Sequence, residues 1–242
     1  MYIVEGNTGV GKSSFLTLMA QYCPEIAVIH EPVENWSGEF SGKSLLENFY
    51  KDPKRWAYTM ETMTMFSRVK EHVREQQSLN VNRLMERSIY SGHYCFAKNG
   101  HAHGFFTPLE WEIYSQWVDY LITKECKAPR GFIYLQATPE VCFKRLRKRN
   151  RSGEESVELE YMKQIHDWHE KLLIDKQDIP ENLKQVPVLV LDCNQDFIEN
   201  HDRMQKFAQH VRDFLLQTQQ TIPHSKSAEL STAVRPDRSS LR

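Results

Sequence analysis

The residues best suited to chemistry stand in one short run near the start of the chain. Residues 6–13 read Gly-Asn-Thr-Gly-Val-Gly-Lys-Ser, which is the spacing of a phosphate-binding loop. The glycines let backbone N–H groups point at a polyphosphate without obstruction by a Cβ atom. Lys12 is placed to bridge the terminal phosphates, and Ser13 offers a hydroxyl group to Mg²⁺. The residues predicted to bind phosphate are Gly6, Asn7, Thr8, Gly9, Val10, Gly11, Lys12, Ser13 and Ser14.

The residues on either side of this loop have the pattern that such a loop requires. An apolar run, residues 1–4, precedes it, and a helical pattern, residues 14–22, follows it. A helix that begins at the loop directs the positive end of its dipole at the bound anion. The alternative is a chance glycine-rich turn, but the order of strand, loop and helix favours phosphate binding.

Acidic and basic residues follow the next apolar runs. Pro32 ends the second run and fixes a turn, which leaves the Glu31 carboxylate facing the crevice beyond the strand. There it could take the proton from an attacking hydroxyl group, the alternative being a solvated glutamate at a strand end. After the third run, Glu86 could serve Mg²⁺, and Arg87 could hold a carboxylate or a phosphate through two hydrogen bonds. The alternative for that pair is a surface ion pair.

A run of basic residues lies further along the chain. It consists of Lys144, Arg145, Arg147, Lys148, Arg149 and Arg151, and a loop containing Gly153 follows it. Alone, such a run is typical of a solvated face or a nucleic-acid patch. In a phosphate-binding protein, at the end of a helix, we interpret it as an arginine-rich lid that neutralises phosphate charge and excludes water.

These residues need a scaffold in which strands alternate with helices. Apolar runs typical of strands cover residues 2–5, 26–30, 83–86, 131–136 and 186–192. Long helical patterns cover residues 55–77, 108–124, 139–150 and 159–173. This alternation predicts an α/β fold of the P-loop NTPase type, with a five-stranded parallel sheet and helices on both faces. Ligands of such sheets lie beyond the carboxyl ends of the strands.

Length and composition exclude several classes of protein. The 242 residues suffice for one α/β domain, which we place at residues 1–221. The rest, residues 222–242, is rich in Ser, Pro, Arg and Thr, so we expect a disordered carboxyl-terminal tail. The formal net charge is −1, so no overall field draws the chain to nucleic acid or to a membrane.

The lack of targeting segments and the scattered cysteines indicate a cytoplasmic protein. No apolar run approaches the roughly 20 residues of a membrane span. The chain enters its first strand at once, which leaves no room for a targeting peptide. The five cysteines are scattered without a C-x-x-C pair, as expected of reduced, structural thiols.

Several further motifs occur in order along the chain. They are Glu31-Pro32-Val33 with Trp36, Arg55-Trp56, Glu86-Arg87-Ser88-Ile89-Tyr90-Ser91, Tyr134-Leu135-Gln136-Ala137-Thr138-Pro139-Glu140, Leu159-Glu160-Tyr161 and Leu191-Asp192. Together with the loop, they resemble the motifs of the non-viral deoxynucleoside kinases, which include deoxycytidine, deoxyguanosine and mitochondrial thymidine kinases. The resemblance runs from Tyr2 to about Thr218 and is far more specific than the loop alone.

The resemblance implies a homodimer that transfers the γ-phosphoryl group of ATP to the 5′-hydroxyl group of a deoxynucleoside, with Mg²⁺ as cofactor. Glu31 would be the general base, and Arg87 would hold its carboxylate and the 5′ oxygen. Glu86 would serve Mg²⁺ together with Ser13, while Lys12 and the lid would spread the developing charge. The residues implied to contact ATP beyond the loop are the lid arginines Arg145, Arg149 and Arg151, and Asp196 and Phe197 where the family holds the adenine.

The resemblance also implies the contacts of the nucleoside. Tyr50 and Glu154 would bond the 3′-hydroxyl group of the sugar. Phe96 would stack on the base, and Trp36 would form a wall of the pocket.

One residue of this implied nucleoside site departs from the family, which usually carries glutamine in place of Glu61. A glutamine amide can pair with adenine, cytosine or thymine, whereas an ionised Glu61 offers acceptors only. Its natural partner is the guanine edge with its N1–H and N2–H₂ donors, and Arg68 at i+7 could donate to guanine O6 or N7. We therefore predict a preference for deoxyguanosine. The alternatives are an ion pair between Glu61 and Arg68, or a shifted helix register.

Gly92 is a second departure, because deoxycytidine and deoxyguanosine kinases carry aspartate there. The glycine removes a carboxylate that would hold the adjacent arginine, and we expect it to enlarge the space near the base. A pyrimidine-specific or broad-specificity kinase therefore stays open as the alternative.

Three other functions compete with this reading. A nucleoside monophosphate kinase shares the loop, the fold and the lid, but its acceptor phosphate needs no general base such as Glu31. A regulatory module would bind ATP without turnover. A nucleic-acid binder would use the basic run, which the near-neutral net charge disfavours.

Overall fold

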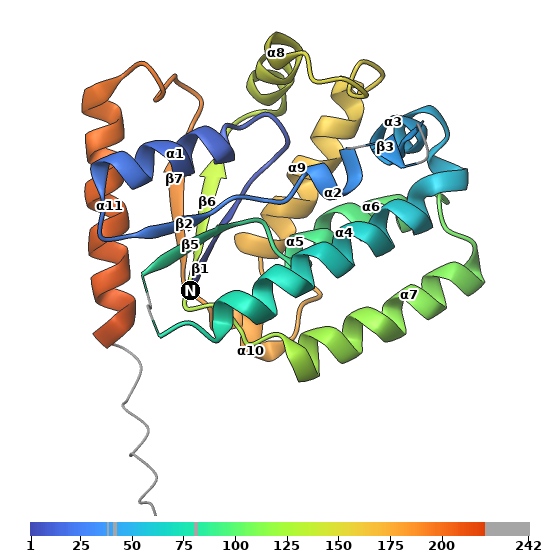
Figure 1. Cartoon of the computed structure of the whole chain (residues 1–242), viewed down its shortest axis with the longest axis horizontal. Coiled ribbons are helices and arrows are strands. Elements are labelled where there is room, and N and C mark those ends of the chain that lie inside the picture. The colour runs from blue at the N-terminus through green and yellow to red at the C-terminus, as the bar shows by residue number, and fades with distance from the viewer. Residues whose placement is uncertain (38, 41–42, 80–81, 221–242) are drawn as a thin grey trace, which may run out of the picture.

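Five parallel strands form the central sheet of the described chain, in the order β2-β5-β1-β6-β7 (Figure 1). They are β1 (Tyr2–Glu5), β2 (Ala27–Ile29), β5 (Arg83–Glu86), β6 (Phe132–Gln136) and β7 (Val188–Asp192). This computed structural model describes residues 1–37, 39–40, 43–79 and 82–220. The predicted strands and their parallel arrangement are confirmed, and the predicted tail, residues 222–242, lies outside the described residues.

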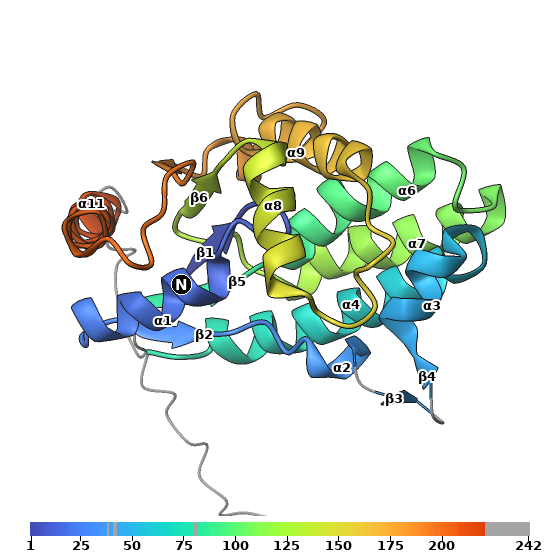
Figure 2. The same cartoon turned by 90° about the horizontal axis from the view of Figure 1, so that it is seen from above.

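The strand side chains alternate between two apolar cores. Tyr2 and Val4 of β1 face one core, in which Phe15 of α1 (Lys12–Tyr22) and Val211 of α11 (His201–Gln220) are buried. Ile3 faces the other core, to which α4 (Pro53–Gln76), α7 (Pro108–Tyr120) and α9 (Leu159–Leu173) contribute buried side chains. Figures 1 and 2 show these helices on opposite sides of the sheet. Because both faces are covered, the strands read as continuous apolar runs.

Local signals in the sequence set where the long helices begin. Asp52 accepts a hydrogen bond from the backbone N–H of Arg55 at 3.2 Å, and Pro53 occupies the first turn of α4. That helix therefore starts two residues before its predicted limit. At α7, Thr107 and Glu110 form a capping box.

The remaining elements are short, apart from α8 at the top of the sheet. The helical segments are α2 (Glu34–Ser37), α3 (Leu45–Lys51), α5 (Ile89–Ser91), η1 (Gly92–Ala97), α6 (Lys98–Ala102), η2 (Leu121–Glu125), α8 (Pro139–Arg149) and α10 (Glu181–Lys184), and β3 (Glu39–Phe40) pairs with β4 (Lys43–Ser44). The segments η1 and η2 are π-helical, and η2 continues α7 without a break to one residue beyond the predicted helix 108–124. None of the helices in the described ranges is long and apolar enough to cross a membrane.

The sheet brings the candidate residues to one edge. Val4 lies opposite Glu86 in the parallel register of β1 and β5, and Ile29 lies opposite Met85 in that of β2 and β5. The chain therefore leaves the three strands at the same edge, carrying the glycine-rich loop, Glu31 and Arg87.

Candidate active site

The glycine-rich loop leaves β1 in a conformation that other residues rarely adopt. The φ angles of Gly6 and Gly9 are +146° and +81°, in the region that favours glycine. A Cβ atom would lie 2.6 Å from the Leu135 carbonyl oxygen at Gly6, and 2.4 Å from the Cys142 carbonyl oxygen at Gly9. Glycine is therefore required at both positions for the loop to pack against β6 and α8.

Lys12 and Ser13, the last two residues of this loop, begin α1. The ammonium group of Lys12 donates to the carbonyl oxygens of Gly6 at 3.1 Å and Asn7 at 3.0 Å. Burial, reinforced by the charge of Arg87, lowers the pKa of Lys12 to about 7. The Ser13 hydroxyl group donates to Glu86 Oε1 at 2.8 Å, so the two residues predicted to serve Mg²⁺ lie side by side. A hydroxyl oxygen and a carboxylate are hard oxygen donors, which suit Mg²⁺.

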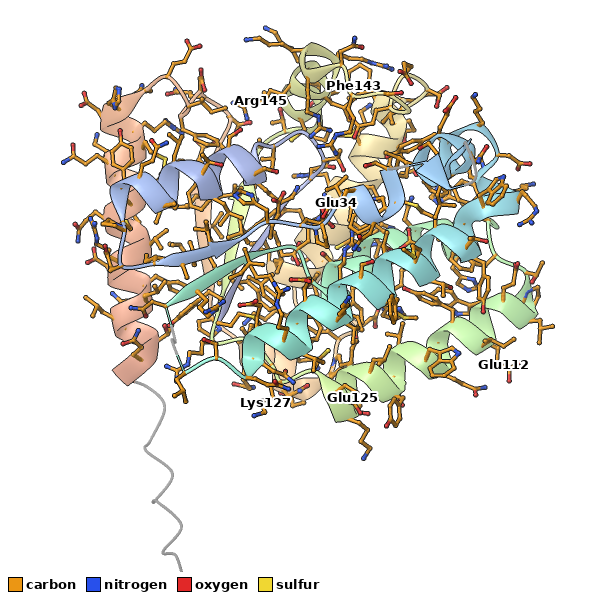
Figure 3. All side chains as sticks on the ribbon, viewed as in Figure 1. Glu34, Glu112, Glu125, Lys127, Phe143 and Arg145 are labelled. Carbon is orange, nitrogen blue, oxygen red and sulfur yellow. The ribbon has the colours of Figure 1, made fainter. Side chains whose placement is uncertain are left out.

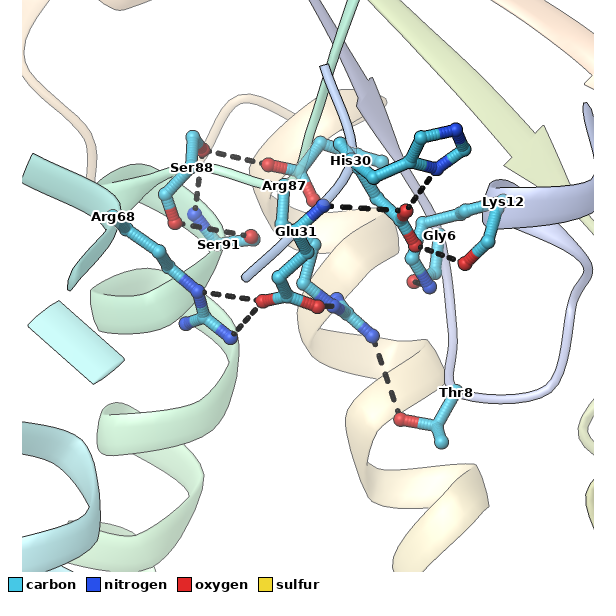
Figure 4. A network of polar contacts seen from close by, with 12 residues as sticks. Gly6, Thr8, Lys12, His30, Glu31, Arg68, Arg87, Ser88 and Ser91 are labelled. Carbon is cyan, nitrogen blue, oxygen red and sulfur yellow. Dashed lines mark hydrogen bonds and ion pairs between the residues drawn. The ribbon is translucent and has the colours of Figure 1, made fainter. Parts of the chain in front are cut away.

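Two arginines hold the Glu31 carboxylate (Figure 4). Glu31 Oε1 accepts from Arg68 Nε at 2.9 Å and Nη2 at 2.8 Å, and Oε2 lies 3.4 Å from Arg87 Nε. Burial alone would raise the pKa of Glu31, but the charges of Arg68, Arg87 and Lys12 outweigh burial and hold it below its usual range. The carboxylate is therefore ionised and oriented at the edge of the loop.

Arg87 joins this carboxylate to the glycine-rich loop. Its backbone has φ of +62°, which is uncommon for a residue other than glycine. Its N–H donates to the Val4 carbonyl oxygen at 3.0 Å, and its Nη2 lies 3.4 Å from the Thr8 hydroxyl oxygen. The surrounding contacts thus fix a strained backbone that aims the guanidinium group into the site.

Most of the predicted site residues line one cavity. Its lining includes Thr8, Gly9, Lys12, Ser13, Glu31, Trp36, Tyr50, Glu61, Arg68, Glu86, Arg87, Phe96, Arg149, Arg151 and Glu154. It also includes Val33, Leu46, Phe49, Met60, Thr64 and Tyr161, which sequence reasoning did not assign to the site. Val33 and Tyr161 stand within motifs that carry the family resemblance, so those motifs could have identified them. Leu46 and Phe49 belong to an ordinary apolar helix face and carry no such signal.

Two arginines of the predicted lid converge on Glu154. Arg149 Nη2 lies 2.8 and 2.6 Å from the two carboxylate oxygens, and Arg151 Nη1 lies 3.7 Å from one of them. Arg147 instead donates to the carbonyl oxygens of Glu155 at 2.6 Å and Val157 at 2.5 Å. The predicted lid thus presents two arginines to the cavity, and a third arginine holds its backbone.

Arg145 does not line this cavity. Figure 3 shows it on α8. Its guanidinium group donates to the carbonyl oxygens of Val10 at 3.3 Å, Cys193 at 2.7 Å and Gln195 at 3.2 Å. It therefore ties the glycine-rich loop to the segment after β7.

Asp196 and Phe197 lie in that same segment. The Asp196 carboxylate accepts from the backbone N–H of Ile198 at 2.9 Å. The Phe197 ring is buried against Phe15 and Phe207, with centroids 6.3 and 5.8 Å away. The ring is thus part of the core, whereas the side chain of Asp196 is exposed.

Two expectations about the base end of the cavity are wrong. The glycine at position 92 does not enlarge the space, because Arg68 Nη1 lies 2.7 Å from where a Cβ atom would stand. The alternative of an ion pair between Glu61 and Arg68 is not found among the described ion pairs, where Arg68 is the partner of Glu31. Glu61 is buried in the cavity wall, and burial raises its pKa to about 7 despite the nearby charge of Arg68.

The parallel sheet and its glycine-rich loop define the P-loop class of nucleotide-binding proteins. Within that class, the family model described as deoxynucleoside kinase matches residues 2–216, and the chain belongs to this family.

Named relatives agree with this assignment. Deoxycytidine kinase 2 of Gallus gallus is 35% identical over 237 residues, which cover 88% of this chain and 89% of the relative. Mitochondrial deoxyguanosine kinase of Xenopus laevis is 37% identical over 235 residues, covering 88% of each chain. Deoxycytidine kinase of Homo sapiens is 33% identical over 238 residues, covering 88% of this chain and 89% of its own. The chain is thus a kinase whose family implies ATP and a deoxynucleoside as substrates.

Proposed function

We propose that this kinase transfers the γ-phosphoryl group of ATP to the 5′-hydroxyl group of a deoxynucleoside and prefers deoxyguanosine. Relatives of similar identity are named for deoxycytidine and for deoxyguanosine, so the base must be argued from the residues of the site. The observation that carries the preference is Glu61, a buried carboxylate in the cavity wall that forms no ion pair among the described residues.

Guanine supplies the hydrogen-bond donors that this carboxylate lacks. Its N1–H and N2–H₂ groups are adjacent donors that can satisfy both oxygens of an ionised Glu61. Cytosine and adenine would place a ring-nitrogen acceptor against the carboxylate unless one of them carried a proton, which costs free energy. A misplaced buried polar group discriminates by a few kcal/mol, about ten-fold to a hundred-fold in kcat/KM.

The proposed chemistry depends on the arrangement around Glu31. A neutral sugar hydroxyl is a weak nucleophile, and an ionised carboxylate held at the loop can accept its proton as the oxygen attacks phosphorus. Arg87 keeps that carboxylate next to the loop through its own contact with Thr8. Lys12, Arg149 and Arg151 would neutralise charge on the transferring group.

The remaining donor residues have supporting roles in this proposal. Ser13 and Glu86 would hold Mg²⁺, which neutralises phosphate charge and orients the ATP. The other residues of the loop would bind phosphates through backbone N–H groups, and the segment containing Asp196 and Phe197 would hold the adenine. Arg145 contributes by fixing that segment to the loop.

At the nucleoside end, aromatic and acidic residues would bind the sugar and base. Tyr50 and Glu154 would bond the 3′-hydroxyl group, with Glu154 also joining the sugar to the lid arginines. Trp36 and Phe96 both lie near Arg68, whose guanidinium carbon is 5.8 and 5.7 Å from their ring centroids. A base beside these rings would occupy the cavity that Arg68 and Glu61 also line.

Assembly and location are further parts of the proposal. We propose a homodimer that uses the apolar surface of α7, where Leu109, Trp117 and Tyr120 are exposed. Large apolar side chains exposed on one helix mark a surface that a second copy can cover. We place the enzyme in the cytoplasm, without a nucleic-acid or membrane partner.

Two variants test this function. We expect wild type to have its highest kcat/KM with deoxyguanosine among the four deoxynucleosides, and Glu61→Gln to lose that preference. Glu71→Gln, which neutralises a carboxylate on the same helix outside the cavity, should keep it. If wild type prefers another deoxynucleoside, the guanine assignment is wrong and a pyrimidine or broad specificity takes its place. If Glu61→Gln keeps a preference for deoxyguanosine, Glu61 does not determine that preference.

The general base is tested separately. Glu31→Gln should lower kcat by about 10²- to 10⁴-fold, whereas Glu34→Gln at an exposed position nearby should not. Wild-type turnover in Glu31→Gln would contradict the mechanism. Product analysis with deoxynucleoside and with deoxynucleoside monophosphate would show whether the acceptor is instead a phosphate.

A further inference from the structure

Thr8 lies in the glycine-rich loop, but its backbone N–H group is already bound within the loop. That group donates to Oδ1 of the preceding side chain, Asn7, at 2.8 Å. In a phosphate-binding loop, the backbone N–H groups that face the anion are the donors that hold it. Because the N–H group of Thr8 is paired with Asn7, its side chain is the part of Thr8 that can serve a ligand in the cavity it lines.

The Asn7 side chain is itself held in place. It is buried, and its Nδ2 donates to the carbonyl oxygen of Met162, in the first turn of α9, at 2.8 Å. An amide group supplies the acceptor that the Thr8 N–H group needs and the donor that the Met162 carbonyl group needs. The reversed amide would set donor against donor and acceptor against acceptor, so the two contacts fix its orientation. Asn7 therefore anchors the backbone of Thr8 to α9.

The Thr8 hydroxyl group lies between the loop and the proposed general base. Its oxygen accepts from Arg87 Nη2 at 3.4 Å, and Nε of the same guanidinium group lies 3.4 Å from Glu31 Oε2 (Figure 4). A hydroxyl group can accept and donate at once. Within the part of the chain that the structure describes, no residue accepts the hydrogen of the Thr8 hydroxyl group. That hydrogen is therefore available to an acceptor in the cavity.

The proposed reaction brings such an acceptor to this position. The phosphates of ATP would lie on the loop, and the attacking sugar oxygen would lie within reach of Glu31. The transferred group passes between them, and Thr8 is the loop residue whose side chain is joined to Glu31 through Arg87. A donor fixed at that point stabilises the charge on the oxygens of the transferred group.

We propose that Thr8 is a catalytic residue whose hydroxyl group donates a hydrogen bond to a non-bridging oxygen of the transferring phosphoryl group, and that Asn7 is the residue that positions it. Arg87 would hold the hydroxyl oxygen, so that its hydrogen points away from the guanidinium group. This inference rests on the proposed function, and for Thr8 it replaces the backbone contact expected of the rest of the loop.

Variants of Thr8 test the role of the hydroxyl group. Thr8→Val has nearly the same shape, and we expect it to lower kcat and kcat/KM for ATP alike by about ten-fold to a hundred-fold, as the loss of a transition-state contact does. Its affinity for ADP, measured by calorimetry, should equal that of wild type, because ADP lacks the transferred group. Thr8→Ser keeps the hydroxyl group and should restore turnover. Thr59→Val, at an exposed position of α4, is the control.

A double-variant cycle tests the role of Asn7. Asn7→Ala should lower kcat in the wild-type background but no further in Thr8→Val, because Asn7 acts through Thr8. Asn7→Asp keeps an acceptor for the Thr8 N–H group and loses the donor to Met162, so it should show the same dependence with a smaller loss. It provides the cycle if the alanine variant does not fold.

Wild-type kcat in Thr8→Val would overturn the inference. Weaker ADP binding in that variant would overturn it too, because the side chain would then shape the loop and not contact the transferred group. Equal losses from the Asn7 variants in both backgrounds would remove the positioning role. Glu31→Gln separates this inference from the proposed function. If it keeps wild-type turnover, the general-base chemistry is wrong. If it is inactive while Thr8→Val turns over normally, only the role of Thr8 fails.

Discussion

Arg149 and Glu154 form an ion pair that joins the predicted lid to the wall of the cavity. Arg149 Nη2 lies 2.8 and 2.6 Å from the two oxygens of Glu154, whose side chain is 4% exposed. Because the chain turns between them through the positive φ angles of Asn150 and Gly153, the two side chains face each other across a short loop. Closure of the lid and binding of the sugar would therefore depend on the same carboxylate.

Replacing this carboxylate should weaken nucleoside use. In Glu154→Gln, we expect kcat/KM for the deoxynucleoside to fall roughly ten-fold to a hundred-fold, the usual effect of losing a charge-assisted hydrogen bond. Steady-state kinetics with varied deoxynucleoside measures this, and Glu158→Gln at an exposed position beyond the lid is the control. Equal kinetics in both variants would show that Glu154 has no part in sugar binding.

The contact between Ser13 and Glu86 predicts that both residues affect the Mg²⁺ requirement of the enzyme. Glu86→Gln and Ser13→Ala should each raise the Mg²⁺ concentration needed for half-maximal activity and lower turnover by about ten-fold to a hundred-fold. A Mg²⁺ titration of kcat checks this, with Thr17→Ala, an exposed hydroxyl one turn further along α1, as the control. An unchanged Mg²⁺ requirement in both site variants would contradict the assignment.

The raised pKa of Glu61 makes the base preference depend on pH. The carboxyl group, with a pKa of about 7, is neutral below that pH and resembles a glutamine amide in offering a donor and an acceptor. Above it, the ionised form offers acceptors only. The ratio of kcat/KM for deoxyguanosine to that for deoxycytidine should therefore increase as pH rises from about 6 to 8. In Glu61→Gln that increase should vanish, and its persistence would assign the titration to another group.

Phe197 is predicted to matter for stability. Its ring packs beneath the glycine-rich loop, 3.0 Å from where a Cβ atom of Gly11 would lie. Phe197→Ala should lower the free energy of unfolding by about 3–5 kcal/mol, as large-to-small changes in cores do. Ile198→Ala, at a half-exposed neighbour, should change it by less than about 0.5 kcal/mol. Denaturant unfolding measures both, and similar values for the two variants would show that the ring is not part of the core.

The exposed apolar side chains of α7 predict that a substitution on this helix disrupts the proposed dimer. Trp117→Asp should convert a dimer into a monomer, because a charge at the centre of an apolar contact is left unpaired when buried. Leu216→Asp, at a comparably exposed apolar position on α11, should not. Sedimentation of each variant gives the mass. If the wild-type protein is a monomer, the proposed dimer is wrong.

The sequence alone determined much of this protein. The spacing of glycines, Lys12 and Ser13 predicted a phosphate-binding loop, and continuous apolar runs predicted all five strands of the described sheet. These signals are local, because backbone conformation, burial of strands and helix caps depend on residues close together in the chain. The residues predicted at strand ends meet because parallel strands share one carboxyl edge.

Only the tertiary structure decided which side chains pair. Arg68 is bound to Glu31, 37 positions away, and not to Glu61 on its own helix. The space expected at Gly92 is filled by that arginine, and the Phe197 ring is in the core. Several acids and bases of this site have more than one partner within reach. The choice among them depends on distances and burial that arise only when the helices pack on the sheet.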